Sequence, residues 1–79
     1  MPVIVKLFAL LRRYRPDVPR GGTLSLDLGA DTTVGEVLKQ LGIPDGAPVV
    51  AMVNGTVRGP DYTLSDGDQL YLFPPVSGG

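Results

Sequence analysis

A chain of 79 residues with 43% hydrophobic content is long enough for one compact domain with a small core. The absence of cysteine and histidine excludes disulfide bonds, thiolate nucleophiles, zinc sites with the usual ligands and a histidine general base. The net charge of −1 gives the whole chain no attraction to nucleic acid. No apolar run approaches the ~18 residues of a membrane span, and no charged-then-apolar start suggests a signal peptide. We therefore expect a cytoplasmic protein with neither nucleic acid nor membrane as a partner.

Two segments near the start have the residue pattern of β-strands. Residues 3–8 are β-branched and apolar except for Lys6, and residues 23–28 alternate between leucine and polar side chains. Successive side chains of a strand point to opposite faces, so one face of each strand is expected to lie in the core. The expected core-facing residues are Val3, Val5, Leu7, Leu24, Leu26 and Leu28.

A basic loop separates these two strands. Residues 9–14 are expected to form a short helical turn that ends before Pro16, because a residue that precedes proline avoids the α region. We interpret this loop as a solvated surface segment, with an acidic protein partner and nucleic acid as alternatives. Its charged and aromatic residues are Arg12, Arg13, Tyr14, Arg15 and Arg20.

Residues 33–41 are predicted to form the main helix. Thr33 and Glu36 have the spacing of a capping box, in which each side chain binds a free backbone amide of the first turn. Gly42 is a suitable residue to follow the helix, and Pro44 prevents its continuation. One apolar stripe is expected to face the core, and it consists of Val34, Val37, Leu38 and Leu41.

The second half of the chain is predicted to contain three more strands. Residues 49–53 and the short segment 56–58 flank Asn54-Gly55, the strongest signal for a two-residue hairpin. Residues 65–68, Ser-Asp-Gly-Asp, are a turn that leads into a last strand at 69–73. This turn lacks the further oxygen ligands of a calcium loop, so we predict no metal site.

The order of these elements predicts an α+β domain. A mixed sheet of four to five strands has one apolar face to cover, and a single helix over residues 33–41 is sufficient for a small sheet. No phosphate-binding loop, dinucleotide-binding fingerprint or nucleophile elbow is present in the sequence.

The last seven residues, Phe73-Pro74-Pro75-Val76-Ser77-Gly78-Gly79, are the strongest candidate site. Pro74 lacks an amide donor and should end strand pairing, and two successive prolines favour an extended course. Glycine has no Cβ, so Gly78 and Gly79 suit a narrow channel in another protein. We expect a domain over 1–75 and a flexible tail over 76–79. Phe73 is expected on the outer face of the sheet, either as an anchor for a partner or packed against a neighbouring loop.

Taken together, these segments resemble the ubiquitin-related sulfur carriers of the MoaD/ThiS family. The resemblance rests on residues 1–6, the 33–41 helix, Val53-Asn54-Gly55, residues 64–68 and the 73–79 segment, whose residues are closest to MoaD. It implies a ubiquitin-like β-grasp fold and a protein that serves as a cosubstrate.

The resemblance also implies the chemistry of the last seven residues. An E1-like enzyme would use ATP to adenylate the Gly79 carboxylate, and a persulfide donor would convert it to a thiocarboxylate. The large subunit of molybdopterin synthase would receive residues 73–79 and the sulfur. The chain itself would bind no cofactor. The alternatives are a carrier for thiazole synthase or another thiolation pathway, a modifier joined to lysines through Gly79, and an interaction module whose Gly-Gly has no chemical role.

The predicted tail can be tested by removing Gly78 and Gly79. We expect sulfur transfer to be lost while the melting temperature stays nearly unchanged, because an unpacked tail contributes no buried surface. Thermal unfolding of the full-length and truncated chains measures this difference. A large loss of stability on truncation would contradict the prediction of a free tail.

Overall fold

The computed structural model describes residues 1–75. Within this range the chain forms seven elements, each of which begins and ends within one residue of a predicted segment. In chain order they are β1 (Pro2–Leu7), the 3-10 helix η1 (Ala9–Tyr14), β2 (Leu24–Asp27), α1 (Val34–Gln40), β3 (Val50–Val53), β4 (Thr56–Arg58) and β5 (Gln69–Phe73). No helix in residues 1–75 has the length and apolar character needed to cross a membrane.

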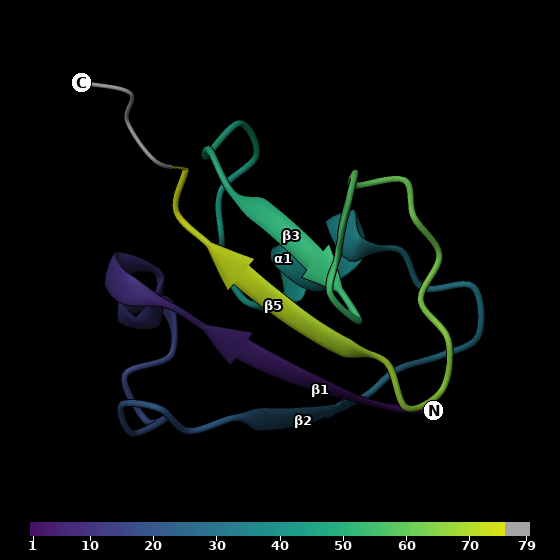
Figure 1. The fold of residues 1–79 in the computed structure, drawn as a ribbon, viewed down its shortest axis with the longest axis horizontal. Helices are drawn as coiled ribbons and strands as arrows, with labels where there is room; N and C mark the ends of the chain where they lie inside the picture. Colours follow the sequence, from purple (N-terminus) through teal and green to yellow (C-terminus); the bar gives the residue numbers. More distant parts are fainter. Residues whose placement is uncertain (76–79) are drawn as a thin grey trace.

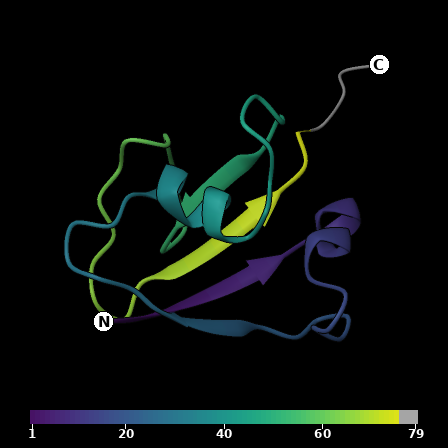
Figure 2. The same ribbon diagram turned by 180° about the vertical axis from the view of Figure 1, so that it is seen from behind.

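The five strands form one mixed sheet in the order β2-β1-β5-β3-β4 (Figure 1). The first and last strands, β1 and β5, lie in the middle and run parallel, and every other neighbouring pair is antiparallel. Helix α1 covers one face of this sheet, as the view from behind shows most clearly (Figure 2). The predicted mixed sheet with one main helix is confirmed.

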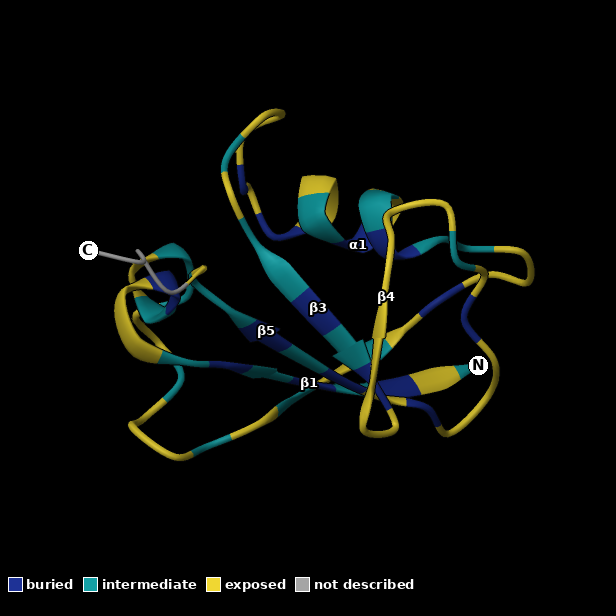
Figure 3. Cartoon of the chain, turned by 45° about the horizontal axis from the view of Figure 1, so that its top comes forward, coloured by how far each residue is buried: buried dark blue, intermediate teal, exposed yellow. Residues whose placement is uncertain are grey.

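The hydrophobic core lies between α1 and the central strands (Figure 3). Most valines and leucines of the predicted inward faces are almost completely buried, and Leu38 of α1 is half-buried. Leu24 and Leu26 are only half-buried, because β2 is an edge strand at the rim of the helix-covered face. The side chains with at most 1% relative exposure are Val3, Val5, Val34, Val37, Leu70 and Leu72.

Helix α1 has the predicted start and end. The Thr33 hydroxyl accepts a hydrogen bond from the Glu36 amide at 3.3 Å, and the Glu36 carboxylate accepts one from the Thr33 amide at 3.2 Å. These two bonds complete the capping box. Gly42 has a φ of +82°, the left-handed conformation that ends many helices.

Asp68 connects two turns at the start of β5. Its carboxylate accepts hydrogen bonds from the Ser65 amide at 2.8 Å and from Asn54 Nδ2 at 2.9 Å, and its exposure is only 7%. Asn54 and Gly55 both have positive φ, as the predicted hairpin turn requires. Within residues 1–75 no group of three or more acidic side chains is placed to hold a metal ion. The hydrogen bond from the Ser65 amide to the Asp68 carboxylate confirms the turn chemistry predicted for this residue.

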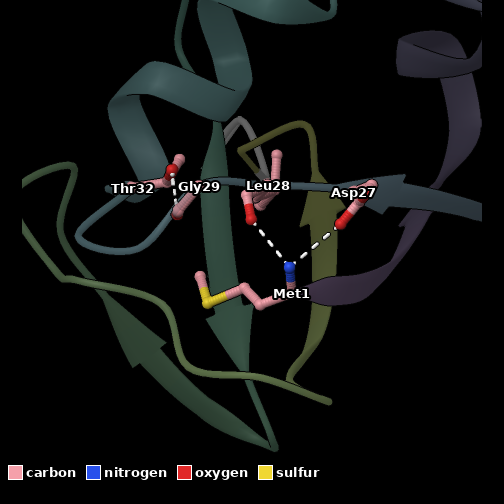
Figure 4. Close-up of polar contacts among 5 residues, drawn as sticks. All are labelled: Met1, Asp27, Leu28, Gly29 and Thr32. Carbon is pink, nitrogen blue, oxygen red and sulfur yellow. Dashed lines mark hydrogen bonds and ion pairs between the residues drawn. The ribbon is translucent and has the colours of Figure 1, made fainter.

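The start of β1 is held to the end of β2 by polar contacts (Figure 4). The Met1 ammonium donates to Asp27 Oδ1 and to the Leu28 carbonyl, both at 2.9 Å. The Leu28 amide donates back to the Met1 carbonyl at 2.9 Å. These bonds extend the β1–β2 ladder and direct the chain towards α1.

Asp68→Ala is expected to destabilise the fold by about 1–3 kcal/mol, because the Ser65 amide and the Asn54 side chain would lose their shared acceptor. Asp66→Ala is the matched control, since Asp66 lies exposed in the same turn, and its effect should stay within about 0.5 kcal/mol. Urea unfolding of both variants measures the difference. Equal effects would show that the Asp68 hydrogen bonds do not stabilise the turn.

Candidate functional site at the end of strand β5

The structure describes three of the seven predicted site residues. Strand β5 ends at Phe73, as expected if Pro74 cannot donate to the ladder. Pro74 is half-buried and Pro75 is exposed. The other four, Val76, Ser77, Gly78 and Gly79, lie outside the described residues, so the predicted tail and its chemistry stay predictions.

Phe73 lies on the sheet face opposite α1, as predicted, but it is not an isolated side chain. Its ring stacks on that of Phe8, with ring centroids 4.3 Å apart and planes inclined by 15°. Phe8 directly follows β1, and its amide donates to the Leu72 carbonyl at 3.0 Å. Phe73 is thus half-buried against the neighbouring strand end, which fixes its position without covering it completely.

Phe73 belongs to an aromatic cluster formed by Phe8, Tyr71 and Phe73. The Phe8 and Tyr71 ring centroids are 5.5 Å apart. Lys6 Nζ lies 5.1 Å from the Phe8 centroid and 6.0 Å from that of Tyr71, distances at which an ammonium is attracted to aromatic rings. The cluster therefore combines an apolar surface with one positive charge beside the end of β5.

The apolar surface continues from the cluster across the outer face of the sheet. Met52 lies opposite Tyr71 in the register, and Val57 lies opposite Met52. Val57 is 63% exposed, and Figure 1 shows no helix in residues 1–75 across this face. Met52 and Tyr71 in the same row are half-buried, so this apolar row is only partly open to solvent and is most exposed at Val57.

The basic loop lies at the same end of the sheet as the aromatic cluster. Helix η1 begins directly after Phe8 and contacts β5, because β1 and β5 run in the same direction. Within the loop, Arg15 donates two hydrogen bonds of 2.9 Å to Asp17, and these bonds lower the pKa of the Asp17 carboxyl below its ordinary value. The Arg13 guanidinium lies 5.2 Å from the Tyr14 ring centroid.

A groove of 460 Å³ lies between α1 and the segment that follows it. Leu38, Ile43, Ala47 and Arg58 are among its lining residues. It opens on the helix side of the sheet, and neither the aromatic cluster nor η1 lines it. The groove is therefore separate from the aromatic cluster at the end of β5.

Sequence patterns placed Phe8 and Phe73 on outer strand faces but did not pair them. The alternation of residues 3–8 gives the face of Phe8, and that of 69–73 gives the face of Phe73. Only the parallel register, with Leu7 opposite Leu72, brings the two rings together. No local pattern in either strand specifies that register.

The five-stranded mixed sheet of residues 1–75, with a single α-helix across it, defines a small ubiquitin-like β-grasp protein. Solved structures share this fold. A ubiquitin from Caldiarchaeum subterraneum covers 100% of this chain and 98% of its own, with a TM-score of 0.60 and 20% identity. Subunit 1 of the molybdopterin-converting factor in a complex from Helicobacter pylori covers 100% of both chains, with a TM-score of 0.63 and 21% identity. Both likenesses concern the fold alone.

More similar proteins identify the family. Residues 5–79 match the sequence model of the ThiS family. The molybdopterin synthase sulfur carrier subunit of Escherichia coli K12 is 37% identical in an alignment of 68 residues, and the match covers 73% of this chain and 83% of that protein. SAMP1 from Haloferax volcanii is 29% identical, covers 100% of both chains and has a TM-score of 0.73. The chain belongs to the ThiS family, which confirms the resemblance to the MoaD/ThiS sulfur carriers.

The stacking of Phe8 on Phe73 can be measured with a double-mutant cycle. Phe8→Leu and Phe73→Leu should show a coupling free energy of about 0.5–1.5 kcal/mol, the range for aromatic pairs. The control cycle combines Phe8→Leu with Val57→Ala on a distant strand, and these effects should add within about 0.5 kcal/mol. Chemical unfolding of the six proteins gives both values. No coupling between Phe8 and Phe73 would contradict the stacked arrangement.

Proposed function

We propose that this chain is the sulfur carrier subunit of a molybdopterin synthase and carries sulfur as a thiocarboxylate on Gly79. The observation that carries the proposal is the 37% identity to the E. coli protein named as the sulfur carrier subunit of that enzyme. The β-grasp fold of residues 1–75 and the match to the ThiS family support it.

The chemistry needs activation of an unreactive group. The Gly79 carboxylate is ionised at neutral pH, because an α-carboxyl group has a pKa of about 3.3–3.7. One of its oxygens attacks the α-phosphate of ATP, pyrophosphate leaves, and an acyl-adenylate forms. The terminal sulfur of a persulfide then attacks the acyl carbon and displaces AMP. A thiol cleaves the remaining sulfur–sulfur bond, which leaves the thiocarboxylate.

The chain needs no catalytic side chain of its own for these steps. It contains neither cysteine nor histidine, so the nucleophiles and bases come from its partners. The partners are an E1-like adenylating enzyme, a persulfide donor and the large subunit of molybdopterin synthase. ATP is used by the activating enzyme and is not a cofactor of this chain.

The outer face of the sheet is the proposed docking surface for these partners. Phe73 is held by Phe8 at the point where the described chain leaves the sheet. An apolar contact centred on this cluster would place residues 74–79 in the partner's channel, with Pro74 and Pro75 restricting the conformations lost on insertion. The E. coli relative, 37% identical, is named as a subunit of molybdopterin synthase, and this supports another subunit of that enzyme as a partner.

Two other functions have specific support. The matching family model is the ThiS family, which favours a carrier that delivers sulfur to thiazole synthase or another acceptor. A second H. volcanii structure is called small archaeal modifier protein 1 and is 29% identical over 95% of this chain, which favours a modifier joined to lysines. Both functions would use the same Gly79 carboxylate.

Intact-mass spectrometry tests the proposal. The chain is incubated with an activating enzyme, ATP and a persulfide donor. Its mass should rise by about 16 Da, because covalent activation of the carboxyl group lets sulfur replace one oxygen atom. The matched control lacks only Gly79 and should gain no mass. Transfer of the sulfur to a pterin precursor with the large subunit then identifies the molybdopterin pathway.

Other results would select another function. Transfer of the sulfur only with thiazole synthase would identify the thiamine branch. A Gly-Gly remnant on partner lysines without any thiocarboxylate would identify a modifier. No mass gain with any activating enzyme of the same organism would overturn the proposal.

A further inference from the structure

We propose that the basic end of the molecule docks on an acidic protein surface that borders the channel for residues 74–79. The basic end is defined as Lys6, Arg12, Arg13, Arg15 and Arg20. This inference rests on the proposed function, because it says that the partner proteins of that function have an acidic surface beside their channel. It adds an electrostatic contact to the apolar contact of the aromatic cluster.

Charge is distributed very unevenly along the chain. The basic end holds five of the seven lysines and arginines, and Asp17 is the single acidic residue between Lys6 and Arg20. The other seven acidic residues all follow residue 20, together with Lys39 and Arg58. A chain with a net charge of −1 therefore has one strongly positive segment on an otherwise acidic domain.

The fold places this segment beside the end of β5. Because β1 and β5 are parallel, both strands end at the same end of the sheet. Phe8 follows β1 there, and Phe73 is the last residue of β5. Helix η1 contacts β5 there, and Figures 1 and 2 both show the helix next to the end of that strand. Any protein that receives residues 74–79 must therefore lie close to the basic end.

Several groups of this segment are available to a partner. Within residues 1–75, Arg15 is the one arginine that forms an ion pair, and its partner is Asp17. Leu10 lies among these arginines and is 75% exposed. Ala9, just before it, has a φ of +54°, a backbone conformation that costs energy for a residue with a Cβ atom. Exposed leucine beside unpaired arginines combines an apolar contact with charge recognition.

The surface around η1 also has a concave shape. A hollow of 310 Å³ is lined by Leu10, Arg12, Arg13 and Val18, with Ala9 and Pro16. A side chain from a partner can enter such a hollow while its neighbouring carboxylates pair with the guanidinium groups. Arginine suits this role because its planar donors match a carboxylate.

A protein partner fits these features better than nucleic acid. Recognition of single-stranded nucleic acid commonly uses aromatic rings as stacking platforms. Tyr14 is the aromatic residue of the loop, and Arg13 already lies over its ring and donates to its hydroxyl at 3.3 Å. The positive charge is also confined to one end of the domain and does not form a long stripe.

The contact should act mainly on the rate of association. Complementary charges steer two proteins into an encounter, and this effect weakens as salt screens the charges. The apolar contact of Phe73 and its neighbours should act mainly on dissociation. The two surfaces can therefore be separated by kinetics.

Stopped-flow association with the large subunit of molybdopterin synthase, and with the activating enzyme, tests this inference. Arg12→Gln/Arg13→Gln should slow association about tenfold at ~0.01 M ionic strength and show a weaker dependence on salt than the natural chain. Lys39→Gln/Arg58→Gln removes the same charge from elsewhere and should change the rate less than about twofold. Thermal unfolding verifies that both variants are folded.

Each other outcome has a clear meaning. Equal rates for the natural chain and the Arg12/Arg13 variant would overturn the inference and leave the proposed function intact. Equal slowing by both double variants would assign the effect to net charge and also overturn it. Binding of transfer RNA that is lost in the Arg12/Arg13 variant, with protein association unchanged, would assign the basic end to nucleic acid. No association of the natural chain with either protein would overturn the proposed function and this inference together.

Discussion

The parallel pairing of β1 with β5 is the constraint on which the rest of the structure depends. The two strands are the first and the last of the chain, yet they form the middle of the sheet. Their inward side chains, such as Val5 and Leu70, are fully buried, because α1 covers them on one face. A one-residue shift of this register would turn the buried set towards solvent, so the core fixes the register strongly.

The same pairing determines what lies at the end of β5. Phe8 stacks on Phe73, and η1 follows immediately with its arginines. Helix α1 covers only one face of the sheet, so Val57 is exposed on the other face and the aromatic cluster is only half-buried there. The body of the protein is thereby equipped for recognition, whereas the reactive group of the proposed chemistry is a backbone carboxylate. This division explains how a chain without cysteine or histidine can serve a sulfur-transfer reaction.

Local patterns predicted most of the fold. Alternation gave the inward faces of residues 3–8 and 69–73, the Thr33–Glu36 spacing gave the start of α1, and Asn54-Gly55 gave the hairpin turn. The bounds shifted by one residue at α1, where both cap residues were counted inside the helix, and at ends of the strands β1, β2 and β3. These features depend on neighbours a few residues apart, which is why they can be read from the chain. The candidate site was predicted less completely, because its parts come from opposite ends of the chain.

The sequence by itself determined the class of elements, the core-facing residues and the resemblance of residues 73–79 to those of a sulfur carrier. It placed Phe8, Phe73 and the arginines on the surface without any relation among them. The tertiary structure alone decided that these groups lie together, through a contact between strands more than sixty residues apart. The physical reason is that the register of β1 and β5 is set by burying the inward faces of both strands under α1. This burial depends on the whole core, so no local pattern in either strand can specify it.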